Sequence, residues 1–219
     1  MTIKIVALGG SLSQQSTSLA ALRVALEGAS LVGAEVELFD VRELELPMYA
    51  PKAASVPNAA RTLCESVYAC QGMLWSSPLY HGTISGSFKN ALDWLQLLGD
   101  RQPPYLTDKV IGLISTAGGT QGLQAVNTME FIVRALRGWA VPLVVPVPQA
   151  WRIIQQGHVL DDSVAPSCAR SVRKSPARPS TSPSGGSPLL RPNEPRPPCN
   201  RSARVKRAGR SHRERSNPF

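Results

Sequence analysis

Three short apolar segments of the 219-residue chain each run into a loop of glycine and hydroxyl residues, and this repeated pattern constrains the fold most. The segments are 3–8, 72–77 and 110–116, a length typical of strands that are covered on both faces. A helical pattern follows each loop, as in a parallel sheet with helices on both sides. In such sheets, ligands bind beyond the carboxyl ends of the strands, where these loops would meet.

The first loop favours a phosphate group. It follows Gly9 and Gly10 and opens into a helical pattern over 19–26. Such a helix start directs unpaired amide N–H groups and the positive helix end toward one point. The alternative is that Ser16 or Ser18 merely caps the helix, which is the commoner role for serine. The hydroxyl donors of this loop are those of Ser11, Ser13, Ser16, Thr17 and Ser18.

The second loop precedes a helix predicted over 88–95, and it contains a single ring, that of Tyr80. Backbone amides of Gly82 and Thr83 are expected to face a planar polar ligand. Pro78 would stiffen the turn that presents them, because proline fixes φ.

The third loop, 117–122, contains three glycines at the end of the segment 110–116. Alone it would be an ordinary turn between a strand and a helix. Three such loops, each after its own predicted strand, indicate one shared ligand site. A helix over 126–136 is expected to follow and to end at Gly138.

The remaining elements fit the same architecture. Residues 35–41 alternate between polar and apolar, which predicts a half-covered strand near an edge, and 59–69 predicts a helix. Residues 140–147 predict a last strand, interrupted by Pro142 and Pro146. Proline cannot donate to a strand ladder, so this strand should also lie at an edge.

The second loop and the helix after it resemble the flavin-ring loop of the NADPH-dependent FMN reductases, a flavodoxin-like family. The residues that match its motif at identical spacing are Pro78, Tyr80, Gly86, Lys89, Asn90, Ala91, Asp93 and Trp94. The departures are Leu79 for Glu, His81 for Asn, Thr83 for Ser and Ser85 for Pro. The first loop keeps Gly10, Ser11, Leu12 and Ser16 of the family's phosphate loop, but has Ser13 where arginine is usual and Ser18 where asparagine is usual.

This resemblance implies a flavodoxin-like, doubly wound parallel sheet of five strands in the order 2-1-3-4-5. It implies bound FMN, reduced by NADPH or NADH, that passes hydride on to flavin or a quinone-like acceptor. FMN would bind to Gly10, Ser11, Ser13, Ser16, Thr17 and Ser18 by its phosphate, and by its ring to Pro78, Leu79, Tyr80, His81, Gly82 and Thr83 on one side and Ser115, Thr116, Gly118, Gly119 and Gln121 on the other. No catalytic side chain is required, and a homodimer across the helix 89–97 is expected.

Two other functions remain open. A flavodoxin-type electron carrier would bind FMN without using NAD(P)H, but such carriers are usually strongly acidic. A nucleic-acid-binding protein would act through the basic carboxyl-terminal segment. The net charge of +9 resides there, because 164–219 holds 13 of the 24 basic residues and only 2 of the 15 acidic ones. The preceding part is near neutral, which favours the reductase over the electron carrier.

The cysteines are typical of a protein without structural zinc or a disulfide framework. Cys64, Cys70, Cys168 and Cys199 form no pair at zinc spacing, and the first two are expected in the core. Trp75 and Trp94 are expected to be buried, with Trp139 a further core candidate, and Trp151 a candidate for a subunit contact. Lys89 and Asp93 are expected to form an ion pair. No signal sequence or membrane-spanning segment is predicted, so a cytoplasmic location is expected.

A helix that closes the family's fold is expected after 157–163, with Asp162 or Ser163 as its cap, but its pattern does not follow. Residues 164–219 hold ten prolines and only one aromatic residue, which predicts disorder after a reductase domain of residues 1–163. Two explanations remain open: a functional basic arm, or out-of-frame translation that replaced the helix. The abrupt change in composition where a helix is due favours the second.

Overall fold

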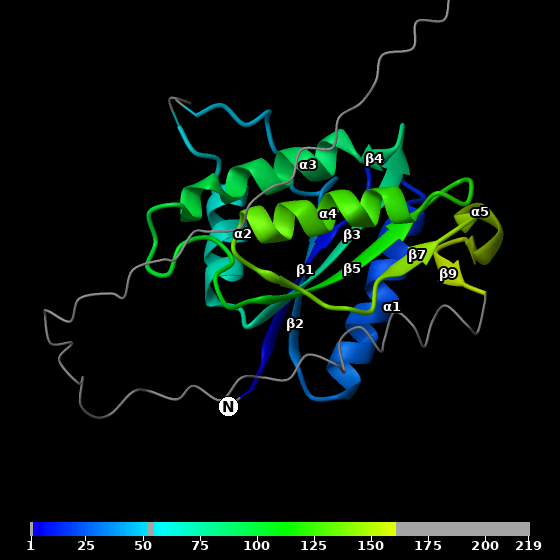
Figure 1. Cartoon of the computed structure of the whole chain (residues 1–219), viewed down its shortest axis with the longest axis horizontal. Coiled ribbons are helices and arrows are strands. Elements are labelled where there is room, and N and C mark those ends of the chain that lie inside the picture. The colour runs from blue at the N-terminus through cyan, green and yellow to red at the C-terminus, as the bar shows by residue number, and fades with distance from the viewer. Residues whose placement is uncertain (1, 52–54, 161–219) are drawn as a thin grey trace, which may run out of the picture. The chain divides into compact units, whose positions relative to one another are not determined.

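A parallel sheet in the order β2-β1-β3-β5-β6 is the centre of the fold (Figure 1). The computed structural model describes residues 2–51 and 55–160. The strands are β1 Lys4–Gly9, β2 Glu35–Asp40, β3 Gly72–Tyr80, β4 Thr83–Ile84, β5 Val110–Thr116, β6 Trp139–Ala140 and β7 Val145–Val147. The helices are α1 Thr17–Leu31, α2 Asn58–Ala69, α3 Gly86–Asp93, the 3-10 helix η1 Trp94–Leu98, α4 Leu123–Ala135 and α5 Ala150–Ile153. This order confirms the predicted doubly wound, flavodoxin-like sheet.

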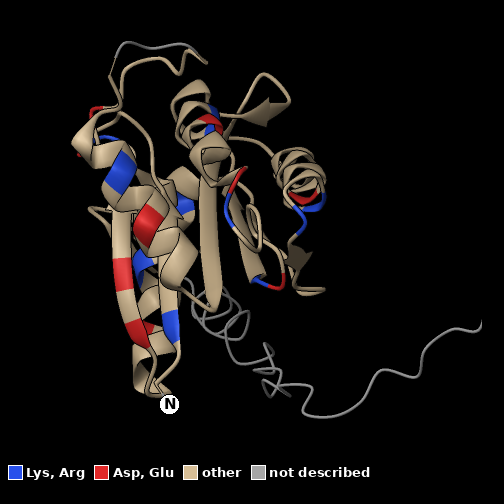
Figure 2. Ribbon diagram, turned by 90° about the vertical axis from the view of Figure 1, so that its left-hand side faces the viewer, with Lys and Arg blue, Asp and Glu red and all other residues tan. Residues whose placement is uncertain are grey.

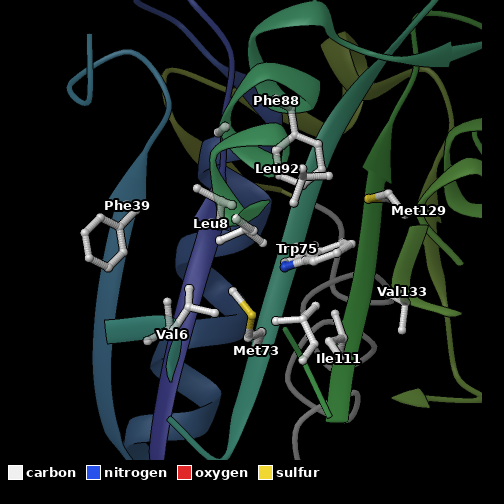
Figure 3. Close-up of a cluster of buried hydrophobic side chains, with 14 of the residues drawn as sticks. Val6, Leu8, Phe39, Met73, Trp75, Phe88, Leu92, Ile111, Met129 and Val133 are labelled. Carbon is white, nitrogen blue, oxygen red and sulfur yellow. The ribbon is translucent and has the colours of Figure 1, made fainter. Parts of the chain in front are cut away.

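Side chains of the central strands are buried on both faces, as the apolar segments predict. Val6 and Leu8 of β1 point toward α2, α3 and α4, and join Trp75 in the larger core cluster (Figure 3). Ile5 and Ala7 point to the other face and pack in a second cluster with α1. Because successive side chains of a strand alternate between the faces, β1 contributes to both clusters. Trp75 and Trp94 are 0% and 2% exposed, so their predicted burial is confirmed.

The last strand is at an edge, as predicted, but it is not continuous. It consists of β6 and β7, which both pair in parallel with β5. Pro142 lies in the gap between them. A proline cannot donate a ladder hydrogen bond, and this break is the physical consequence. A small antiparallel pair, β8 Ile154–Gln155 and β9 His158–Val159, follows α5.

Two expectations about the end of α4 are wrong. The helix ends at Ala135 rather than at Gly138, and the residue with a left-handed backbone is Arg137, with φ 67°. Gly138 is needed for space, because a Cβ there would lie 2.6 Å from Cδ1 of Ile111. Trp139 is not a core residue, since it is 61% exposed on the edge strand β6.

Charged residues of both signs are interspersed over the described elements (Figure 2). The predicted pair forms, with Nζ of Lys89 2.6 Å from Oδ1 of Asp93. Lys4 and Glu37 make a further ion pair, at 2.8 Å, between β1 and β2. None of the helices in the described part of the chain is long and apolar enough to cross a membrane. The predicted closing helix, its caps Asp162 and Ser163, and the predicted disordered segment 164–219 lie outside the described residues.

Candidate functional site

The first loop starts where β1 ends and reaches the amino end of α1. Gly10 has φ 97°, and a Cβ there would lie 2.8 Å from Oδ1 of Asp40, so the chain turns tightly beside β2. Ser16 is the cap of α1, and its Oγ accepts a hydrogen bond from the amide of Leu19 at 3.2 Å. The capping role anticipated for serine is therefore confirmed for Ser16. A hydroxyl that accepts one hydrogen bond still has its own proton to donate to a ligand.

The other hydroxyl groups of this loop differ in exposure and partners. Oγ of Ser11 accepts from the amide of Ser13 at 3.4 Å, and Oγ of Ser13 accepts from the amide of Gln15 at 3.3 Å. Ser13 is exposed, whereas Ser18 is 1% exposed and its Oγ lies 3.1 Å from that of Ser16. Ser18 thus contacts the hydroxyl of Ser16 from the buried side of the loop, and Ser13 faces solvent.

The second loop is a β-hairpin, which the sequence did not predict. Strand β3 continues to Tyr80, three residues beyond the predicted end, and Tyr80 pairs with Thr83 of β4. The turn consists of His81 and Gly82, with φ of 48° and 85°. A two-residue turn with both φ values positive matches the right-handed twist of the strands. Pro78 therefore does not stiffen the turn: it lies buried within β3, opposite Thr116 of β5.

The hairpin exposes four of the six residues expected to face a ring. Tyr80 is 50% exposed, and His81, Gly82 and Thr83 are all exposed, whereas Leu79 is half-buried. Oγ1 of Thr83 lies 3.2 Å from Oγ1 of Thr128, which joins the hairpin to α4. The hairpin is therefore held against α4 beside its turn.

The third loop is held by the segment that follows β7. The amide of Ala117 donates to the carbonyl of Val147, and the amide of Gln149 donates to that of Gly119, at 3.0 and 2.9 Å. Oγ of Ser115 donates to the carbonyl of Gly122 at 2.6 Å, which closes the loop. Ser115 and Thr116 are consequently buried, and Gly118, Gly119 and Gln121 are the exposed residues of the predicted set.

The three loops lie at the carboxyl edge of the same sheet, and hydrogen bonds join the first loop to β5 and to β3. Oγ1 of Thr17 donates to Oγ1 of Thr116 at 3.2 Å, which joins the first loop to the third. The amide of Gly10 donates to the carbonyl of Ser76 at 3.1 Å, which joins the first loop to β3. Residues 99 positions apart in the sequence thus form one rim, lined mainly by hydroxyl groups and backbone amides.

Two motif residues assigned to the flavin loop by resemblance have another role. Asn90 is 7% exposed, and its Oδ1 accepts from the amide of Tyr49 at 2.8 Å. Its Nδ2 donates to the carbonyls of Leu46 and Pro47 at 3.3 and 3.0 Å. Nε1 of Trp94 also donates to the carbonyl of Pro47, at 3.0 Å. Together these two side chains clamp the segment 46–49 to α3. Their spacing of four residues, which places them on one helix face, is the sequence signal that could have indicated this contact.

Two cavities border the rim. One, of about 530 Å³, lies between the hairpin and α4 and is lined by Tyr80, His81 and Thr128 among others. The other, of about 240 Å³, lies between the first loop, the clamped segment and the start of α3. Leu12 of the first loop forms part of its wall. Both open beside residues of the predicted site.

Shifted pKa values occur at the opposite edge of the sheet. Burial lowers the pKa of Lys109, whose Nζ donates to the carbonyls of Tyr68 and Cys70 at 2.9 and 2.7 Å. Burial raises the pKa of Cys64 to about 12 and also raises that of Cys70. Both thiols are buried, as predicted. These shifts reflect burial of Cys64 within α2 and of Cys70 and Lys109 beside its end, away from the rim.

Comparison with known proteins gives the same assignment. Residues 3–152 match the NADPH-dependent FMN reductase family. The NADPH-dependent FMN reductase ArsH of Acidithiobacillus ferrooxidans is 34% identical over 125 residues, which are 57% of this chain and 51% of that protein. The FMN-dependent NADPH-azoreductase of Staphylococcus aureus is 31% identical over 138 residues, 61% of this chain and 70% of that protein.

A solved structure supports the fold. The flavoenzyme NAD(P)H:(acceptor) oxidoreductase FerB of Paracoccus denitrificans superposes with a TM-score of 0.59 at 19% identity, covering 78% of this chain and 94% of that one. The chain spans about half the length of the ArsH relative. The family match covers most of the chain, and it includes all three loops of the rim. The chain belongs to the NADPH-dependent FMN reductase family.

Proposed function

We propose that this protein is an NAD(P)H-dependent FMN reductase that passes hydride from nicotinamide to bound flavin, and on to flavin or a quinone-like acceptor. The observation that carries this proposal is the hydrogen bond from Thr17 to Thr116, which joins the first loop to the end of β5. It brings the amino end of α1 to the strand that bears the third loop. A phosphate group and a ring attached to it would therefore bind to one continuous rim.

The residues present fit FMN. The phosphate would be held by the amides at the start of α1 and by the hydroxyl groups of Ser11, Ser13 and Ser16, with Thr17 and Ser18 as supports. Helix amino ends favour anions because their N–H groups are unpaired and their dipole is positive there. The ring would lie between the hairpin and the third loop, with buried Pro78, Ser115 and Thr116 as supports behind it. The residues that would face it are Leu79, Tyr80, His81, Gly82 and Thr83 on one side and Gly118, Gly119 and Gln121 on the other.

FMN supplies the chemistry, because its ring accepts hydride from a nicotinamide and donates it to an acceptor. The protein's part is to hold the two partners in contact and to keep water away. The rim suits this role, because it offers amides and hydroxyl groups from rigid strand ends. Exposed Tyr80 supplies apolar area beside the ring site. A side-chain acid or base is not needed for hydride transfer.

The proposal is tested with the purified full chain. Equilibrium dialysis should show one FMN per chain, and NADPH oxidation should depend on added FMN. Gly119→Val should weaken FMN binding at the rim, whereas Leu31→Ala, at the exposed end of α1 and away from the rim, should leave it unchanged. Absence of flavin binding in a folded protein would refute the reductase. FMN binding without NADPH oxidation would favour the electron carrier.

A homodimer and a cytoplasmic location form part of the same proposal. The outer face of α3 and η1 presents Leu97, which is 37% exposed, and the neighbouring helix α4 presents Phe131, which is 75% exposed. Exposed apolar residues on adjacent helices favour pairing of two copies there. NAD(P)H is supplied in the cytoplasm, which is where a reductase of this kind would act.

A further inference from the structure

We propose that Trp151 and Arg152, two exposed neighbours on α5, bind the adenosine 2′-phosphate of NADPH. The adenine would stack on the indole ring, and the guanidinium would donate to the phosphate. The pair would thereby select NADPH over NADH as the hydride donor. This inference rests on the proposed reductase function, and it names the residues that would distinguish the two donors.

Helix α5 lies directly beside the third loop (Figure 1). The amide of Ala150 donates to the carbonyl of Ala117, and the amide of Gln149 donates to that of Gly119, both at 2.9 Å. The third loop would line one side of the flavin ring. A dinucleotide whose nicotinamide lies on that ring would therefore have α5 within reach of its adenosine end.

The backbone of α5 is held in place at both ends. Ala150 at its start and Ile154 just after its end are 3% and 4% exposed, and both pack in the cluster that contains α1. Gln149, just before the helix, has a left-handed backbone with φ 46°. This conformation is unfavourable for residues other than glycine, and it persists only where the surroundings impose it. The helix therefore presents Trp151 and Arg152 from a fixed position.

The two side chains are stacked on each other. Trp151 is 58% exposed, and Cζ of Arg152 lies over its ring, 4.6 Å from the ring centre. A guanidinium is planar, and its N–H groups lie in its own plane, so a group that covers a ring can still donate in pairs to a phosphate. Arg152 forms no ion pair with any residue that the structure describes. The stacked pair therefore offers an aromatic surface and a free cation side by side.

The distribution of charge around the rim favours a phosphate at Arg152. The three loops, 9–18, 77–87 and 115–122, contain no lysine, arginine, aspartate or glutamate, and Arg152 is the only such residue in 145–160. A phosphate monoester carries close to two negative charges at neutral pH, whereas the 2′-hydroxyl of NADH carries none. Because Arg152 is exposed, water weakens the attraction, and we expect about a ten-fold preference for NADPH.

The phosphate of FMN is the other phosphate monoester expected near the rim. The amides and hydroxyl groups at the start of α1 would hold it, and the flavin ring would lie between the hairpin and the third loop. Neither part of FMN would need an indole ring on α5. Trp151 therefore favours the adenosine phosphate, in which a second aromatic ring accompanies the anion.

The first test measures binding to the full chain and needs neither flavin nor turnover. The probes are adenosine 2′,5′-bisphosphate and 5′-AMP, which lacks the 2′-phosphate. In protein labelled with 5-fluorotryptophan, the bisphosphate should shift the ¹⁹F NMR signal of Trp151. The signal of Trp139, which is 61% exposed and pairs with the opposite end of β5, should stay in place. 5′-AMP should bind about ten-fold more weakly than the bisphosphate.

Variants separate the two contacts. Arg152→Met should remove most of the difference between the probes, whereas Arg61→Met, which removes an exposed arginine from α2, should retain it. Trp151→Leu should weaken both probes about five-fold, because both carry the adenine that stacks on the ring. Trp139→Leu should leave both unchanged. A Trp151 signal that does not respond to the bisphosphate, or a difference that survives Arg152→Met, would overturn the proposal.

Turnover distinguishes this inference from the function on which it rests. In the FMN-loaded protein, Arg152→Met should raise the NADPH concentration for half-maximal anaerobic flavin reduction about ten-fold, and change that for NADH little. Weaker FMN binding in this variant, with the NADPH preference retained, would assign Arg152 to the flavin phosphate and overturn the proposal. If the bisphosphate binds at Trp151 but NADPH does not reduce the flavin, the proposed function fails and the nucleotide site stands.

Sedimentation tests the other expected role of Trp151, a subunit contact. The proposal predicts that Trp151→Leu leaves the oligomeric state of the full chain unchanged. A shift from dimer to monomer in this variant, together with a Trp151 signal that ignores the bisphosphate, would assign the ring to the subunit contact and overturn the nucleotide site.

Discussion

Ser13 occupies the position where the family's phosphate loop has an arginine, and it is exposed at the rim. A charge-assisted hydrogen bond from arginine to phosphate contributes roughly 1.5–3 kcal/mol. We expect Ser13→Arg to tighten FMN binding about ten-fold or more, measured by quenching of flavin fluorescence. The unmodified chain should bind FMN more weakly than relatives with the arginine. A similar gain from Gln14→Arg would show that the added charge acts from a distance.

The Cys64 thiol has a pKa of about 12, raised from 9.0 chiefly by burial. The native state thus disfavours the thiolate. The protonated thiol of Cys64 therefore contributes fully to stability below pH 9, and this contribution is lost as the pH rises from 9 toward 12. In a Cys168→Ser, Cys199→Ser variant, iodoacetamide should label Cys64 at pH 8 only after unfolding, as followed by mass spectrometry. Rapid labelling of the native protein would contradict the burial of this thiol.

At the scale of an element, the hairpin of β3 and β4 depends on its turn. His81 has φ 48°, and histidine tolerates this region less well than the asparagine that the family usually has there. We expect His81→Asn to stabilise the protein by about 0.5 kcal/mol and to raise Tm by roughly 1–2 °C in calorimetry. His81→Val should have the opposite effect, because a β-branched residue is strained at positive φ.

The clamp between α3 and the segment 46–49 is a second element whose energy can be measured. Asn90→Leu removes three hydrogen bonds and leaves backbone groups of Leu46, Pro47 and Tyr49 without this partner. We expect a loss of about 2–3 kcal/mol in the free energy of unfolding by urea. Lys89→Ala, which breaks an exposed ion pair on the same helix, should cost only about 0.3–0.5 kcal/mol.

A double-mutant cycle separates the clamp from general damage to the helix. Trp94→Phe removes the second donor to the carbonyl of Pro47. Because both side chains hold the same segment, the double variant should lose less stability than the sum of the single variants. Additive losses would mean that Asn90 and Trp94 act independently.

For the whole molecule, the expected homodimer can be tested at one position. Leu97 lies at the end of η1 and is 37% exposed. If two copies pair across this face, Leu97→Asp should shift sedimentation from dimer to monomer, because it would bury an unpaired charge in the interface. Leu31→Asp, on the opposite face of the sheet, should leave the dimer intact. A monomeric unmodified chain would refute pairing.

Most of the sheet could be predicted from the sequence, because buried parallel strands are uniformly apolar and their ends are marked by glycine. The hairpin could not, because its turn depends on the backbone of His81, which no local rule predicts. The clamp was also missed, since Asn90 contacts residues 41 to 44 positions earlier in the chain. Trp139 is a large apolar residue of the kind usually found in a core, but it is exposed because β6 lies at the edge of the sheet.

The anchoring of the third loop by residues 147–150 has a consequence for biosynthesis. Ala117 exchanges backbone hydrogen bonds with Val147 and Ala150, at 3.0 and 2.9 Å. A nascent polypeptide that has left the ribosome only as far as α4 therefore has two of its three loops in place and the third untethered. FMN is then expected to bind only after these late residues have emerged. Flavin binding would therefore follow folding of the domain and would not guide it.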